Sequence, residues 1–146
     1  MKAAANRFVI DASIAVAWCF DDEKTQFTER TLDQIADGAE VVVPALWPFE
    51  VANALLIAER RKRLTTAQST AFLNELESLN ISIDAASLLR TFNQVLVEAR
   101  QYNLTAYDAA YLELALRRGL PLATLDDNLK KAAKAVGVPF AHSSSG

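Results

Sequence analysis

Short apolar runs alternate with longer amphipathic stretches along the whole of this chain. The runs predict strands at residues 7–11, 41–43, 81–84, 120–124 and 138–140. An unbroken apolar run, rather than an alternating one, is typical of a strand buried on both faces of a parallel sheet. Between the runs, apolar residues recur at helical spacing, which predicts helices at residues 12–20, 24–36, 46–60, 66–79, 85–102, 105–118 and 129–136.

This alternation predicts an α/β fold of three layers, in which helices cover both faces of a mainly parallel central sheet. Right-handed crossovers place the carboxyl ends of all the strands at one edge of such a sheet, and open α/β folds bind their ligands at that edge. Residues 138–140 contain a proline, so we expect them to form an edge strand. The apolar stripes predict that two helices bury the following side chains: Phe72, Leu73, Leu76 and Leu79, and Leu88, Leu89, Phe92, Val95 and Leu96.

Four acids recur where the predicted strands and helices meet. Asp11 ends the first strand and Asp126 follows the fourth, while Glu50 and Asp108 lie in the first turns of helices. Each acid has an ordinary structural interpretation, because Asp is a frequent N-cap and the positive end of a helix favours acids. Thr105 and Asp108 also resemble a capping box. The recurrence of four acids at one kind of position favours a shared function instead.

A cluster of four carboxylates needs a counter-charge. Two unit charges 4 Å apart repel by about 4 kcal/mol at an effective dielectric constant of 20. Mg²⁺ and Mn²⁺ prefer oxygen ligands and usually keep several waters, so a few carboxylates suffice to hold them. Such a metal activates water and supports in-line displacement at phosphorus. Ser13, Asn53 and Thr124 are placed to support the acids, although capping or helix packing explains these three residues equally well.

Composition limits the remaining possibilities. With 51% hydrophobic and 23% charged residues, residues 1–141 are expected to form one globular domain, followed by a disordered tail at residues 142–146. The one cysteine excludes an internal disulfide framework and fits the cytoplasm. The one histidine, His142, lies in the tail, which argues against a serine–histidine triad. No apolar run approaches the roughly 20 residues of a membrane span, so we expect no membrane contact.

The net charge of −3 gives no overall attraction to nucleic acid, so any such contact must come from a local basic patch. The one dense basic run consists of Arg60, Arg61, Lys62 and Arg63. Two interpretations of this run stay open. It either complements the dipole at the end of a solvated helix, or it contacts phosphate groups.

Four short motifs resemble the PIN domain, and more narrowly the VapC-type toxins of bacterial and archaeal toxin–antitoxin pairs. They are Val9-Ile10-Asp11-Ala12-Ser13, Glu50-Val51-Ala52-Asn53-Ala54-Leu55, Thr105-Ala106-Tyr107-Asp108-Ala109-Ala110-Tyr111 and Ala123-Thr124-Leu125-Asp126. Each motif alone is weak, but the ordered set extends over nearly the whole chain.

The resemblance implies a PIN-like fold and a Mg²⁺- or Mn²⁺-dependent endoribonuclease. It assigns metal binding and positioning of the attacking water to Asp11, Glu50, Asp108 and Asp126. Ser13, Asn53 and Thr124 match the supporting polar positions of the family. The resemblance further implies a homodimer that is neutralised by a small antitoxin, with the helices of residues 46–79 as part of the antitoxin contact.

Three other functions would also use some of these residues, but each conflicts with one feature of the sequence. A haloacid-dehalogenase-like phosphohydrolase uses a second aspartate two residues after the first, where this chain has Ser13. A response-regulator receiver domain has a lysine before its last proline, where this chain has Val138 before Pro139. A non-catalytic PIN-like domain that only binds a partner predicts degraded acids, yet all four are present.

Overall fold

A four-stranded, all-parallel sheet forms the centre of the computed structural model, which describes residues 6–86 and 88–141. Its strands are β1 (Arg7–Ile10), β2 (Glu40–Val43), β3 (Ile81–Ile83) and β4 (Leu122–Ala123), in the order β3-β2-β1-β4. The chain first builds the sheet outward from β1 through β2 to β3, and then returns to place β4 on the other side of β1. The boundary between β1 and β4 is therefore the topological switch point, the usual ligand site of open α/β sheets.

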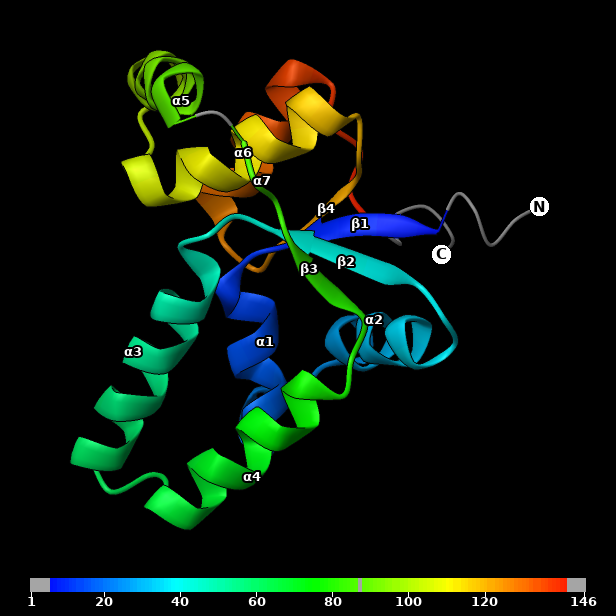
Figure 1. Cartoon of the computed structure of the whole chain (residues 1–146), viewed down its shortest axis with the longest axis vertical. Coiled ribbons are helices and arrows are strands. Elements are labelled where there is room, and N and C mark those ends of the chain that lie inside the picture. The colour runs from blue at the N-terminus through cyan, green and yellow to red at the C-terminus, as the bar shows by residue number, and fades with distance from the viewer. Residues whose placement is uncertain (1–5, 87, 142–146) are drawn as a thin grey trace.

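Helices cover both faces of the sheet, which confirms the predicted three-layer α/β fold (Figure 1). One layer contains α5, α6 and α7, and the other contains α1, α2 and the pair α3–α4, which extends away from the sheet. The helices are α1 (Ala12–Cys19), α2 (Gln26–Ala36), α3 (Trp47–Arg60), α4 (Thr66–Glu77), α5 (Leu88–Tyr102), α6 (Ala106–Arg118) and α7 (Asp127–Val136). None of the helices among residues 6–86 and 88–141 is long and apolar enough to cross a membrane.

The two central strands explain why the sequence folds this way. Phe8, Val9 and Ile10 of β1 and Val41–Val43 of β2 are all buried, because helices lie over both faces of the sheet. β-branched residues dominate these strands and favour the extended backbone. The apolar runs thus hold β1 and β2 in the core, and they deliver the residues that follow to the carboxyl edge.

Several element boundaries differ from the prediction for local reasons. α2 begins at Gln26 rather than Lys24, because Thr25 and Thr28 form a reciprocal capping box there. The acids before it, Asp21–Glu23, form a separate 3-10 turn, η2. The predicted edge strand at residues 138–140 is wrong, since only a single parallel bridge joins Phe140 to Leu122. Pro139 cannot donate a hydrogen bond to extend that bridge into a strand.

The predicted inner faces of two helices are partly wrong. In α4, Phe72 and Leu76 are buried but Leu73 is 43% exposed. In α5, Val95 is buried against α6, whereas Phe92 is 58% and Leu96 45% exposed. The apolar stripe of α5 is therefore wider than the surface it covers. The side chains of residues 88–90 and the predicted tail at residues 142–146 lie outside the described residues.

Candidate active site

Asp11 lies directly after β1 and is held by three donors. The hydroxyl of Ser13 donates to Oδ1 over 2.6 Å, and the hydroxyl of Thr124 donates to Oδ2 over 2.5 Å. The backbone N–H of Ile14 also donates to Oδ1, so Asp11 is the N-cap of α1. The residue is only 4% exposed, and burial raises its pKa to about 6 despite these hydrogen bonds. The orientation of this carboxylate is therefore fixed before any ligand arrives.

The same hydroxyls tie the end of β4 to the end of β1. Ser13 Oγ accepts a hydrogen bond from the backbone N–H of Leu125 over 3.0 Å. Thr124 Oγ1 accepts one from the backbone N–H of Asp126, also over 3.0 Å. Asp126 in turn accepts from the backbone N–H of Leu129 over 2.8 Å and so caps α7. These bonds hold Asp126 beside the switch point, in the turn between β4 and α7.

Glu50 approaches from α3 and is bound by a tyrosine of α6. Proline in the first turn starts α3 after β2, which places Glu50 one turn into the helix. The hydroxyl of Tyr111 donates to Glu50 Oε1 over 2.5 Å, across 61 positions in sequence. Tyr111 is buried, and its burial together with the bond to Glu50 raises the pKa of its hydroxyl. Tyr111 therefore stays protonated and donates permanently to Glu50.

Asp108 is electrostatically coupled to the other three acids. It lies in the first turn of α6, where its backbone N–H donates to the N-cap Thr105. Burial raises the pKa of its carboxyl group, and the negative charges of Asp126 and then Glu50 raise it further. The charge of Asp108 raises the pKa of Asp11 in the same way. Asp108 therefore lies within electrostatic range of the other three acids, near the carboxyl edge of the sheet.

Residues 8–135 match the family described as PIN domain. The chain belongs to the PIN domain family. This PIN domain is also 30% identical over 133 residues to ribonuclease VapC3 of Pyrobaculum aerophilum, an alignment that covers 91% of this chain and 99% of that protein.

Solved structures show the same fold. The crystal structure of PAE2754 from Pyrobaculum aerophilum superposes with a TM-score of 0.69 at 25% identity, covering 89% of this chain and 87% of that one. The structure of VapBC2 from Rickettsia felis, bound to a DNA fragment from its promoter, gives a TM-score of 0.64 at 14% identity, covering 92% of this chain and 96% of that one. The PIN-like fold expected from the motifs is confirmed.

The donors of this PIN domain fit a hard divalent cation. All four acids offer carboxylate oxygen, and burial raises the pKa values of Asp11 and Asp108, so a bound cation would favour their charged forms. Among residues 6–86 and 88–141, no three acidic, histidine or cysteine side chains are grouped closely enough to bind one ion together. Mg²⁺ does not require such a group, because it keeps several waters and is usually held by one or two carboxylates.

Two residues at the site differ from the sequence-based expectation. Asn53 was expected to orient Glu50, but its side chain is exposed on α3, and the hydrogen bond to Glu50 comes from Tyr111. Tyr111 lies three residues after Asp108, which places both side chains on the same face of α6. That spacing was the available signal for its role. Asp127, next to Asp126, is exposed and points to no described partner.

The basic run divides into two parts. Arg63 forms ion pairs within the protein, with Asp22 over 3.2 Å and with Glu23 over 3.1 Å. Its guanidinium also lies 4.1 Å from the centre of the Phe20 ring. Arg63 therefore joins the end of α3 to η2. Arg60, Arg61 and Lys62 are exposed and have no described ion pair, so their charges are available to a partner.

Separate replacements test this division. We expect Arg63→Ala to lower the free energy of unfolding by about 1–2 kcal/mol, from the lost cation–π contact and exposed ion pairs, without changing affinity for RNA or antitoxin.

Replacing Arg60, Arg61 and Lys62 together by alanine should leave stability unchanged. It should weaken one of those affinities and flatten its salt dependence. Urea unfolding and binding titrations at several salt concentrations measure both effects. Unchanged binding of both RNA and antitoxin by the triple variant would contradict the second part.

Proposed function

We propose that this protein is a Mg²⁺- or Mn²⁺-dependent endoribonuclease that cleaves RNA phosphodiester bonds with an activated water. The proposal is supported by the position of Asp11 and Asp126 at the ends of neighbouring strands, and by the electrostatic coupling of Asp108 to Asp11, Asp126 and Glu50. The similarity to ribonuclease VapC3 supports the same substrate class.

The four acids do not all have the same role in this proposal. A bound cation would lower the pKa of its water and neutralise charge on the phosphate. Asp11 presents a carboxylate in one orientation, because Ser13 and Thr124 occupy both of its oxygens from the sides. Tyr111 fixes Glu50 through Oε1 and leaves Oε2 for the cation or the attacking water. Asp108 and Asp126 supply the remaining charge. Asn53 is exposed on α3, one turn after Glu50.

We further propose that the protein is the toxin of a toxin–antitoxin pair that acts in the cytoplasm. The antitoxin would bind the helical pair α3–α4, which extends from the sheet and includes the exposed Arg60, Arg61 and Lys62. Formation of a homodimer belongs to the same proposal. The similarity to VapC3, and the VapBC2 complex among the structures of this fold, support it.

Membership of the PIN family removes the phosphohydrolase and receiver-domain alternatives. A non-catalytic PIN-like domain that only binds a partner is the remaining alternative. The buried, preoriented Asp11 argues against it, since an ionised buried carboxylate destabilises a fold and is retained where it has a use.

Cleavage of total RNA by the purified protein tests the proposal. We expect discrete fragments in Mn²⁺ or Mg²⁺ and none after addition of a chelator, because the acids repel one another and cannot activate water alone. Gel analysis of labelled RNA measures this result, and a general phosphatase substrate should not be turned over. Fragments that form equally well in the chelator would contradict metal dependence. Binding of an antitoxin without any RNA cleavage would favour the non-catalytic alternative.

A further inference from the structure

Two exposed aromatic side chains directly precede two of the acids in sequence. Phe49 is 78% and Tyr107 63% exposed, which makes them the two most exposed large apolar side chains of the described residues. Phe49 directly precedes Glu50 in α3, and Tyr107 directly precedes Asp108 in α6. Neither ring contributes to the core. Large apolar side chains that are exposed to solvent beside a functional site indicate a binding surface.

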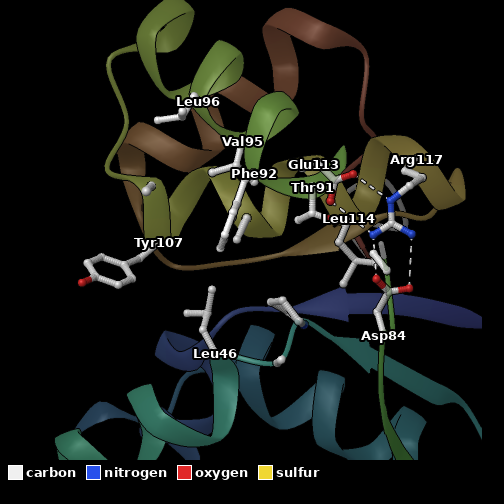
Figure 2. A pocket seen from close by; sticks show the side chains of 15 residues that line it. Leu46, Asp84, Thr91, Phe92, Val95, Leu96, Tyr107, Glu113, Leu114 and Arg117 are labelled. Atoms are coloured by element: carbon white, nitrogen blue, oxygen red, sulfur yellow. Dashed lines mark hydrogen bonds and ion pairs between the residues drawn. The ribbon is translucent and has the colours of Figure 1, made fainter. Parts of the chain in front are cut away.

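An apolar groove extends from Tyr107. Its volume is about 590 Å³, and it lies between α5, α6 and the segment before α3. Leu46 and Tyr107 both line it, and Phe49 lies three residues after Leu46, on the same side of the start of α3. Figure 2 shows the ring of Tyr107 projecting outward from α6 near Leu46, while Phe92 points into the groove from α5.

Arg117, at the far end of the groove, and Arg118 are paired with acids of the protein. Arg117 forms ion pairs with Asp84 over 2.6 Å and with Glu113 over 2.7 Å. Arg118 also pairs with Asp84. These cations are neutralised by their own neighbours, as the dashed lines in Figure 2 show for Arg117. These two arginines therefore add little to the neutralisation of phosphate along the groove.

We propose that Phe49 and Tyr107 stack on the unpaired bases that flank the scissile phosphate of a single-stranded RNA. This inference rests on the proposed ribonuclease function. The acids place the scissile phosphate, and the ribose links each neighbouring base closely to that phosphate, so those bases reach the residues beside Glu50 and Asp108. Aromatic side chains bind splayed bases of single strands, and they do so with tolerance for sequence. Duplex RNA, whose bases are already stacked, is excluded by the same feature.

Binding of RNA to a variant that cannot cleave tests the inference. In an Asp11→Asn background with Mn²⁺, the probe is a short, unstructured, fluorescently labelled RNA. We expect Phe49→Ala and Tyr107→Ala each to weaken binding about ten- to hundredfold, with the slope of affinity against salt unchanged. Phe49→Tyr and Tyr107→Phe should retain binding. Phe92→Ala is the matched control, because this exposed aromatic residue lines the groove but adjoins no acid, and its binding should stay at the parent value.

A second probe separates stacking from other effects. RNA with an abasic ribose on either side of the cleaved bond should bind the parent more weakly and should show no further loss with the alanine variants. Equal losses on intact and abasic RNA, or parent-like binding by both alanine variants, would overturn the inference. A third result would also overturn it: Phe92→Ala loses RNA binding as the other two alanine variants do, and all three variants sediment as smaller species than the parent protein. The groove would then bind a second copy of this chain. Absence of cleavage by the wild-type protein would contradict only the proposed function, since this assay needs none.

Discussion

We expect Asp11→Asn to lower the rate of RNA cleavage by at least about a thousandfold, a loss typical of central catalytic groups. Asparagine has nearly the same shape and keeps an acceptor for Ser13 or Thr124, but it supplies no negative charge for a divalent cation. Asp108→Asn should have an effect of the same order, because Asp108 is the acid whose charge reaches the other three. Single-turnover cleavage of a labelled RNA in Mn²⁺ measures the loss.

Asp127→Asn is the matched control for this change. Asp127 is adjacent to Asp126 and carries the same charge, but it is exposed in the first turn of α7. Its replacement should leave the rate unchanged. Circular dichroism should show that all three variants keep the helical content of the wild type. Equal rates for Asp11→Asn and wild type would contradict the assigned role of Asp11, and an Asp127→Asn protein as slow as Asp11→Asn would indicate a general effect of charge.

The metal-free protein should become less stable as the pH rises from about 4 to about 6. The pKa of Asp11 is raised from 3.8 to about 6 by burial, so within this window the folded protein binds more protons than the unfolded chain. The free energy of unfolding therefore falls through the window, by up to about 3 kcal/mol for a shift of this size, and the loss is complete above the folded pKa. Urea unfolding in chelator at a series of pH values measures it.

Comparison with Asp11→Asn isolates this contribution from other titrating groups. The variant lacks the ionisable group, so it should be the more stable protein at neutral pH without metal, and the difference between the two curves should disappear near pH 4. Mn²⁺ should reverse the order at neutral pH, because it binds the folded wild type and stabilises it by mass action. Parallel curves for the two proteins in chelator would contradict a destabilising charge at Asp11.

The four strands of the sheet, and the positions of Asp11 and Asp126 after neighbouring strands, could be predicted from sequence because they follow from the apolar runs. The apolar run before Asp11 requires a strand buried on both faces, and the parallel topology then brings its end beside that of β4. Capping explains the position of Asp126 without competing with its proposed function, since Oδ2 accepts from Leu129 and Oδ1 is left available.

Features that depend on distant partners could not be predicted in the same way. The bond between Tyr111 and Glu50 joins α6 to α3, and no local pattern gives their relative placement. Arg63 resembled its three basic neighbours in sequence, but only the fold shows that it pairs with η2. The exposed face of α5 was misjudged because an apolar stripe at helical spacing is the same whether it meets a core or lines an open groove.

The rate of RNA cleavage as a function of Mn²⁺ concentration, for wild type and Asp11→Asn side by side, tests the central claim most directly. If the four acids form a metal-dependent nuclease site, the wild-type rate rises from zero in chelator to a plateau, and the rate of the variant stays near zero at every concentration. A wild-type rate that does not depend on the metal, or a variant that reaches the wild-type plateau, would contradict the claim.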